Sequence, residues 1–382
     1  MSSEKKPPVI VVLQLTGGND YFNSVIPYTD SNYYDSRKTF PVSQDDVVKL
    51  DNSMGLHPTM EPLKAIYEQG DMAIIHGVGY ENSPRSHFRS MDIWHTCEPD
   101  TVGTEGWLGK AIRDIDPRGE NPIIGVNIGQ ALPRALVVPG VPVASVNDLT
   151  TYGLLTNVEE ENKRAQILER FSNMYGQAIG TGPVNDYLAR TGLDALKGAD
   201  ILKRGLGKYS SNVEYGTDNI SKSLRDVAMI HTADLGTRIF YTQHGSFDTH
   251  ASQKPVFDKL WTEVSRAIND FWADLREHDA DDNVVMFLFS EFGRRVRDNG
   301  SGTDHGAAGV CFAIGPSVKG GMYSEYPNTN ADALEQGDLV PNQDFRGVYS
   351  TLLDDWMSLD PVSIVGGHFE RPKFIEDTLV TV

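Results

Sequence analysis

The chain has 382 residues, a length that suits one large α/β domain with insertions. Hydrophobic residues make up 39% and charged residues 23%, which is ordinary for a folded globular protein. The 34 basic and 53 acidic residues give a formal net charge of −19. Such a surface repels phosphate backbones and anionic lipids, so neither nucleic acid nor a membrane is an expected partner.

Neither the two cysteines nor the N-terminal residues indicate a disulfide framework, a signal peptide or a membrane span. Cys97 and Cys311 have no CxxC partner and cannot form a disulfide framework, so we expect small buried hydrophobes. The first apolar run, residues 9–13, is too short for a signal-peptide core or a membrane span. We therefore expect a cytoplasmic protein, or a periplasmic one if an export leader was removed.

The N-terminal half alternates short apolar runs with glycine-rich loops. A short run rich in β-branched residues that ends in glycines is typical of a buried parallel strand. Such runs predict strands at residues 9–15, 72–75, 123–128 and 135–138. Apolar spacing predicts helices at residues 58–70 and from the segment 83–88 through Trp94.

The C-terminal half repeats this alternation more clearly. Helices are predicted at residues 224–235 and 254–279, the second with apolar residues every three or four positions. Strands are predicted at residues 238–242, 283–289 and 310–314. Alternating strands and helices predict a single α/β domain over residues 1–382, built on a mainly parallel sheet with helices on both faces. The polar segments 28–53 and 150–220 are expected to be insertions that shape the pocket.

Polar residues gather where these strands end or begin. Parallel strands bring their carboxyl ends to one edge of a sheet, where ligands of α/β proteins bind. The residues at such positions are Asp20, the segment 83–87, Asp248, His250, Glu291, Asp304 and His305. We expect these residues to meet at that edge.

Asp248 and His250 are two positions apart, so in extended backbone their side chains point to the same side. A carboxylate and an imidazole could grip one cation together, and this mixture suits zinc, manganese or iron better than calcium. Asp304 and His305, flanked by glycines, offer further ligands. Two simpler alternatives stay open: Asp20 as a helix N-cap, and Glu291 as the partner of Arg294 or Arg295.

Ser86 is the candidate nucleophile, with Arg85 and His87 on either side. It precedes a predicted helix, whose N-terminal amides and dipole would stabilise an anion. The alternative is that Ser83 or Ser86 only caps this helix. No Gly-x-Ser-x-Gly elbow occurs here, which disfavours an ordinary serine esterase. The loop 17–20 does not fit Gly-x-Gly-x-x-Gly, which disfavours a dinucleotide site.

Taken together, the motifs resemble those of the DUF1501 family, in order and over nearly the whole chain. They are Leu-Thr-Gly-Gly-Asn-Asp-Tyr-Phe-Asn at residues 15–23, Arg-Ser-His-Phe at 85–88, Phe-Asp-Thr-His at 247–250, Ser-Glu-Phe-Gly-Arg at 290–294, Gly-Thr-Asp-His-Gly at 302–306 and Asp-Phe-Arg at 344–346. This resemblance implies an alkaline phosphatase-like sandwich, a fold shared with sulfatases and phosphodiesterases.

The resemblance also implies roles for single residues. Ser86 would be the nucleophile, with His87, Arg85 and Arg294 as further catalytic residues. The implied metal ligands are Asp20, Asp248, His250, Glu291, Asp304 and His305. One departure stands out: the strand that usually ends in Asp-His ends here in Glu291-Phe292, so one histidine ligand is missing. This departure leaves the number of metals at one or two, with zinc or manganese expected first and magnesium or calcium as alternatives.

The implied function is a metal-dependent hydrolase of phosphate or sulfate esters. Ser86 or a metal-bound water would attack a small anionic ester, and Arg85 or Arg294 would hold its oxygens. Two alternatives remain: a non-catalytic protein that binds a metal or an anion, and a metal-dependent hydrolase of carboxylic esters or amides. The sequence does not indicate an oligomeric state.

Overall fold

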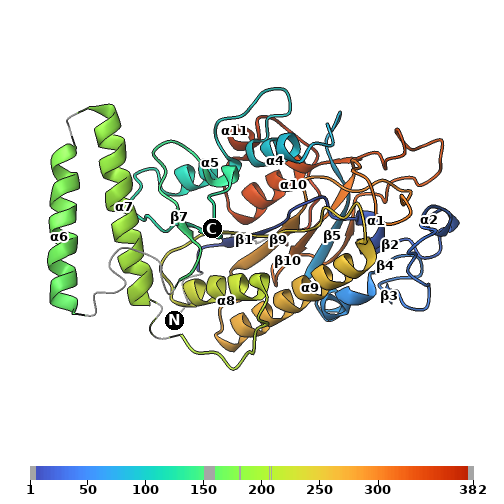
Figure 1. The fold of residues 1–382 in the computed structure, drawn as a ribbon, viewed down its shortest axis with the longest axis horizontal. Helices are drawn as coiled ribbons and strands as arrows, with labels where there is room; N and C mark the ends of the chain where they lie inside the picture. The colour runs from blue at the N-terminus through green and yellow to red at the C-terminus, as the bar shows by residue number, and fades with distance from the viewer. Residues whose placement is uncertain (1–5, 150–159, 180–181, 206, 208, 377–382) are drawn as a thin grey trace.

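The computed structural model describes residues 6–149, 160–179, 182–205, 207 and 209–376. Its centre is a large sheet with the order β11-β5-β10-β9-β1-β8-β6-β7, to which β12 is added beside β5 (Figure 1). The strands are β1 (Val9–Leu15), β5 (Met72–Gly79), β6 (Gly125–Ile128), β7 (Ala144–Val146), β8 (Ile239–His244), β9 (Val284–Phe289), β10 (Gly309–Ile314), β11 (Gly321–Tyr323) and β12 (Gln343–Asp344).

The sheet is mainly parallel, as predicted. β1 pairs in parallel with both β8 and β9, and β6 pairs in parallel with β8 and β7. β10 runs antiparallel to its neighbours β5 and β9. The predicted strand at residues 135–138 is wrong: Arg134–Leu136 forms a 3-10 turn after Pro133, and the strand at this edge is β7.

Helices cover both faces of the sheet, which confirms the predicted fold class (Figure 1). β1 shows the reason, because its alternate residues enter different cores: Val11 and Leu13 join one cluster and Ile10 and Val12 the other. One face carries η1 (Pro58–Leu63), α3 (Lys64–Glu68), α8 (Asn219–Thr232) and α9 (Gln253–Glu277). The other carries α4 (His87–Thr96), α5 (Trp107–Ile115), α10 (Phe345–Thr351), η4 (Leu352–Trp356) and α11 (Pro361–Val365).

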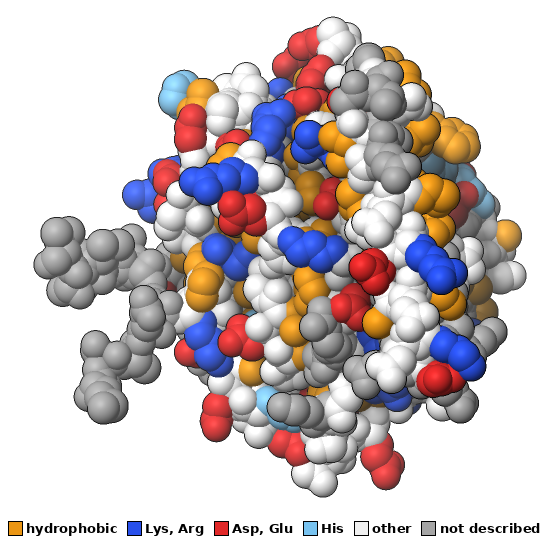
Figure 2. Space-filling model, turned by 90° about the vertical axis from the view of Figure 1, so that its left-hand side faces the viewer, with side chains coloured by type: hydrophobic (Ala, Val, Ile, Leu, Met, Phe, Trp, Pro, Cys, Tyr) orange, Lys and Arg blue, Asp and Glu red, His pale blue; other side chains and the backbone are white. Residues whose placement is uncertain are grey.

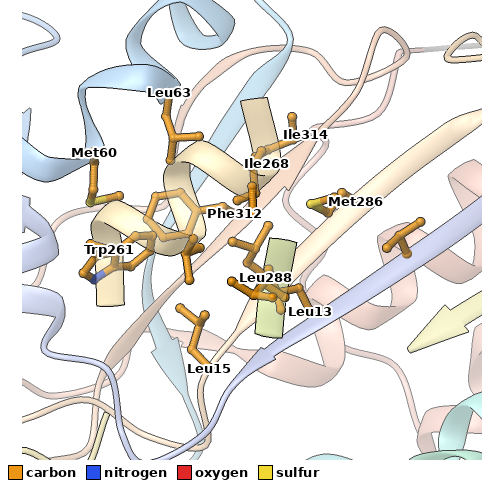
Figure 3. Packing of buried hydrophobic residues seen from close by; sticks show 14 of the residues in the cluster. Leu13, Leu15, Met60, Leu63, Trp261, Ile268, Met286, Leu288, Phe312 and Ile314 are labelled. Atoms are coloured by element: carbon orange, nitrogen blue, oxygen red, sulfur yellow. The ribbon is translucent and has the colours of Figure 1, made fainter. Parts of the chain in front are cut away.

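The apolar stripe of α9 packs as the sequence predicts. Trp261 and Ile268 of α9 lie against the sheet beside Leu63 of η1, with Leu288 and Phe312 beneath them (Figure 3). All five side chains are fully buried. Each such burial contributes roughly 1.5–3 kcal/mol, so this layer stabilises the packing of α9 and η1 on β9 and β10.

The two predicted insertions have different structures. The segment 28–53 includes α2 (Ser31–Ser36) and β3 (Val48–Lys49), which joins β2 (Val25–Ile26) and β4 (Gly55–Leu56) in a small antiparallel sheet next to α1 (Tyr21–Ser24). Within 150–220, α6 (Glu161–Ala178) and α7 (Pro183–Gly205) form a helical hairpin at one end of the molecule, while residues 150–159 lie outside the described residues (Figure 1). Basic and hydrophobic side chains are interspersed on this end (Figure 2). Among the described helices, none has the length and apolarity to cross a membrane.

Candidate functional site

The candidate site lies at the carboxyl ends of three adjacent strands, β9, β1 and β8. The loop after β1 places Gly17 against both neighbours. Its N–H donates to the Glu291 carboxylate after β9 (2.9 Å), and a Cβ at Gly17 would lie 2.4 Å from the Asp248 nitrogen after β8. Gly17 also has φ +121°, a backbone conformation that favours glycine. The chain therefore needs glycine here to bring the three loops together.

One carboxylate and three imidazoles meet at this edge. Among the described residues, His87, Asp248 and His305 each offer a ligand atom, and these atoms lie within 4.8 Å of one another. His250 joins them, with its Nε2 3.0 Å from His305 Nε2 and 3.1 Å from Asp248 Oδ1. We call these four residues the His3Asp cluster.

His87 is fixed in the cluster by Glu291. Its Nδ1 lies 2.8 Å from Glu291 Oε1, and Glu291 is wholly buried, where it also accepts the Gly17 N–H. Because an ionised carboxylate only accepts hydrogen bonds, the imidazole proton lies on Nδ1. This hydrogen bond raises the pKa of His87 above its usual value. The other nitrogen, Nε2, is buried without a hydrogen-bond partner and lies 3.4 Å from Asp248 Oδ2.

His305 and His250 are oriented in the same way. His305 Nδ1 donates to the Arg85 carbonyl (2.9 Å), which leaves the lone pair of Nε2 directed into the cluster. His250 Nδ1 lies 3.3 Å from Asp304 Oδ1. Burial would raise the pKa of Asp248, but the Arg294 guanidinium that donates to its carboxylate helps to lower it to about 2. The cluster thus presents an ionised carboxylate and inward imidazole nitrogens.

The structure separates the six predicted metal ligands into three groups. Asp248, His250 and His305 converge. Glu291 and Asp304 instead bind the outer nitrogens of two imidazoles, and His87, predicted only as a catalytic neighbour, takes a place in the cluster. Asp20 is engaged elsewhere.

Asp20 forms a buried ion pair with Arg37. Both of its oxygens accept from the guanidinium at 2.7 Å, and both side chains are fully buried. Gln253 Nε2 donates to the same carboxylate, and Gln253 Oε1 accepts from Thr303. Arg37 lies in the segment 28–53, where the sequence gives no signal for this partnership. Asp20 therefore connects this insertion to the core, a role different from the expected metal ligand.

Arg294 also differs from its expected role of holding the substrate. Its side chain is fully buried and donates to the backbone carbonyls of Gly17, Gly18, Phe247 and Thr303. Its Nη2, which contacts the Gly17 and Phe247 carbonyls, also donates to Asp248 Oδ1 at 2.8 Å. Arg294 therefore ties together the loops that carry the cluster, and it has little capacity left for a ligand.

Ser86 occupies the N-cap position of α4, as predicted, but its side chain makes no capping hydrogen bond. It is partly exposed and lies between the Arg85 carbonyl that binds His305 and the His87 ring. Arg85 itself has φ +53° and donates from Nε to Asp338 at 2.6 Å. Ser86 is thus next to His87 in the chain and its hydroxyl does not cap α4, whereas the Arg85 guanidinium is engaged with Asp338 and Gln336.

The fold and the site together define an α/β protein that carries a cluster of potential metal ligands at the carboxyl ends of its parallel strands. Residues 208–378 match the sequence model of the family described as "Protein of unknown function (DUF1501)". This match confirms the resemblance to the DUF1501 family for the matched segment, which contains the motifs at residues 247–250, 290–294, 302–306 and 344–346.

Several solved structures are similar to the chain at low identity. The PsFucS1 sulfatase from Pseudoalteromonas sp. has 11% identity and a TM-score of 0.40, covering 95% of this chain and 68% of its own. A protein in the alkaline phosphatase superfamily from Vibrio parahaemolyticus has 7% identity and a TM-score of 0.40, covering 94% and 71%. The alkaline phosphatase from the Antarctic bacterium TAB5 has 13% identity and a TM-score of 0.33, covering 82% and 93%. No curated protein matched the chain.

Proposed function

We propose that the protein hydrolyses phosphate or sulfate esters and holds one divalent metal ion at the His3Asp cluster. The observation that carries this proposal is the orientation of the imidazoles. Each has its outer nitrogen held by an acceptor: His87 by Glu291, His250 by Asp304 and His305 by the Arg85 carbonyl. Such outer partners fix the tautomer and ring position of histidine ligands in metal proteins.

The donor set fits a transition metal. Three imidazoles and one carboxylate suit zinc or manganese, whereas magnesium and calcium prefer oxygen ligands. The 3.0 Å between His250 Nε2 and His305 Nε2 is close to the spacing of about 3.3 Å expected for two tetrahedral zinc ligands. A cation would also satisfy His87 Nε2, which is buried without a hydrogen-bond partner.

We infer one metal rather than two. Asp20, the expected ligand of a second ion, directs both oxygens to Arg37, and the fully buried Arg294 supplies a second fixed positive charge beside Asp248. Two guanidinium groups thus already supply positive charge to the carboxylates of this region. The strand end that lacks the second histidine, Glu291-Phe292, agrees with this arrangement.

A metal in the cluster would act as a Lewis acid that stabilises negative charge on the ester oxygens. The chain supplies the nucleophile, Ser86, at the N-terminus of α4, where backbone N–H groups and the helix dipole favour an anionic group. Ser86 Oγ bonds to the phosphorus or sulfur, the alcohol leaves, and water then releases the acid and restores the serine. Glu291 keeps the proton of His87 on Nδ1, so that Nε2 faces the cluster.

The test compares metal-loaded wild-type protein with Ser86→Ala on a panel of phosphate monoesters, phosphate diesters and sulfate esters. We expect turnover on this panel and a loss of roughly a hundredfold or more in kcat for Ser86→Ala, with unchanged metal content. Ser90→Ala is the matched control. It also removes a serine hydroxyl from α4, but the Ser90 hydroxyl accepts a hydrogen bond from Tyr80 and has no role in the proposed reaction. Bound metal without any turnover would favour a binding protein, and faster turnover of carboxylic esters would favour the acyl hydrolase.

A further inference from the structure

The loop that joins β5 to α4, residues 80–86, carries two groups of the candidate site but has little support from its own backbone. The Arg85 carbonyl accepts from His305 Nδ1 at 2.9 Å, and Ser86 is the last residue before α4. Within the described part of the chain, residues 81–85 make no hydrogen bond from backbone to backbone. A side chain must therefore fix the position of this loop.

The backbone of Arg85 is in the left-handed region, with φ +53°. This conformation is unfavourable for arginine, because its Cβ comes too close to the following carbonyl oxygen, whereas glycine and asparagine tolerate it better. A residue of this kind stays in the left-handed region only where the surrounding structure holds it there.

The Arg85 side chain is held by Asp338. Asp338 Oδ2 accepts from Arg85 Nε at 2.6 Å and lies 2.5 Å from Nη2 of the same guanidinium, while Gln336 Oε1 accepts from Nη1 at 3.2 Å. The Asp338 side chain is only 1% exposed, so its carboxylate is shielded from water. Charge-assisted hydrogen bonds from several nitrogens of one guanidinium fix its orientation as well as its position.

Asp338 is in turn tied to the segment that contains His305. The backbone carbonyls of residues 337 and 339 accept from the backbone N–H groups of residues 296 and 308, which lie on either side of that segment. Asp338 and His305 thus share one frame, and the ion pair with Asp338 fastens the Arg85 loop to it.

We propose that Asp338 is a positioning residue for the candidate site. Its ion pair holds Arg85 in the left-handed conformation, which directs the Arg85 carbonyl to His305 Nδ1 and leaves His305 Nε2 facing the His3Asp cluster. Because Ser86 follows Arg85 directly, the same conformation determines where Ser86 enters α4. The roles of the metal and of Ser86 rest on the proposed function, whereas the effect on the His305 tautomer does not.

The test compares Arg85→Met with Arg85→Asn. Both variants remove the guanidinium and leave Asp338 without it, but only asparagine readily adopts a positive φ. We expect the zinc affinity to fall about 10–100-fold in Arg85→Met and in Asp338→Ala, because His305 loses the acceptor that orients it, and to stay within about threefold of wild type in Arg85→Asn.

Arg89→Met is the matched control for the loss of an arginine. Arg89 forms an ion pair with Asp92, and its other partners are the carbonyls of residues 98, 99 and 101, so none of them belongs to the His3Asp cluster. The zinc affinity of this variant should equal that of wild type.

A second measurement needs neither metal nor substrate. NMR of the imidazole nitrogens in metal-free, histidine-labelled protein shows which nitrogen carries the proton, at a pH where the imidazole is neutral, and His305→Gln assigns the His305 signals. We expect His305 to be protonated on Nδ1 alone in wild type and in Arg85→Asn. In Arg85→Met and in Asp338→Ala we expect a mixture of the two tautomers.

The outcomes separate this inference from the proposed function. The same His305 tautomer in wild type, Asp338→Ala and both Arg85 variants would overturn the positioning role of Asp338, and ester turnover by wild type would then leave the hydrolase intact. A mixture of tautomers confined to Arg85→Met and Asp338→Ala would support the positioning role, and absence of ester turnover in wild type would then overturn the hydrolase alone.

Discussion

Replacing Arg37 by methionine should destabilise the fold without removing the metal site. Arg37 and Asp20 are fully buried, and the two hydrogen bonds between them are 2.7 Å long. Methionine approximates the length of the arginine stem, so the main change is an uncompensated buried carboxylate at Asp20. Breaking such a pair costs about 3–5 kcal/mol, because the remaining charge stays desolvated.

This cost translates into a measurable shift of the melting temperature. At about 2.1 cal/mol/K for each of 382 residues, the entropy of unfolding is about 0.8 kcal/mol/K. A loss of about 4 kcal/mol therefore lowers Tm by about 5 °C. Differential scanning calorimetry of wild type, Arg37→Met, Asp20→Asn and the double variant would give the magnitude and the coupling of the pair.

The double variant is the informative control. It removes both charges, so we expect it to be more stable than either single variant, with a coupling energy of about 2 kcal/mol or more. Zinc content should be the same in all four proteins. Unchanged Tm in Arg37→Met, together with loss of zinc in Asp20→Asn, would refute the structural role of the pair.

Three further predictions concern the site and the core. Glu291→Gln should leave the fold intact but weaken metal affinity or turnover by about 10–100-fold, because the amide no longer fixes the His87 proton on Nδ1. Wild-type metal affinity and turnover in this variant would argue against His87 as a metal ligand oriented by Glu291. Gly17→Ala should lower the free energy of unfolding in urea by at least about 1 kcal/mol and weaken metal binding. The reason is that φ is +121° at this position and the new Cβ would lie 2.4 Å from the Asp248 nitrogen. Equal stability of this variant and wild type would contradict the described conformation of the loop after β1. Burial lowers the pKa of His95 to about 4, so the unfolded chain binds more protons between pH 4 and 6.5. The contribution of His95 to the free energy of unfolding is therefore complete above pH 6.5 and falls by up to about 3 kcal/mol toward pH 4. His95→Gln should flatten the pH dependence of the free energy of unfolding. An unchanged slope in this variant would exclude His95 as the source of that dependence.

The sheet could be predicted from the sequence where strands are buried on both faces. The apolar run at residues 9–15 and the runs before Ser290 and His244 have that character, and β1, β9 and β8 follow them. The run at residues 135–138 misled the prediction because it is equally apolar, but its first two residues belong to the 3-10 turn Arg134–Leu136, which Pro133 caps. A short apolar run does not distinguish a strand from a buried turn.

The candidate site was predictable only in part. Strand ends indicated that Asp248 and His250 would lie at this edge, because parallel strands bring their carboxyl ends together. His305 reaches the same edge because it precedes β10, which runs antiparallel to β9. The roles of Asp20 and Glu291 depend on partners that the sequence cannot select. Each is a carboxylate at a strand end, and only tertiary packing decides whether it faces a cluster, an arginine or an imidazole.

Metal stoichiometry tests the central claim most directly. Wild type, Asp248→Ala and Asp20→Asn would each be stripped of metal, reconstituted with zinc or manganese, and measured by elemental analysis. A single His3Asp site predicts one equivalent in wild type and in Asp20→Asn and none in Asp248→Ala. Two equivalents in wild type with one lost in Asp20→Asn, or no metal in wild type, would contradict the claim.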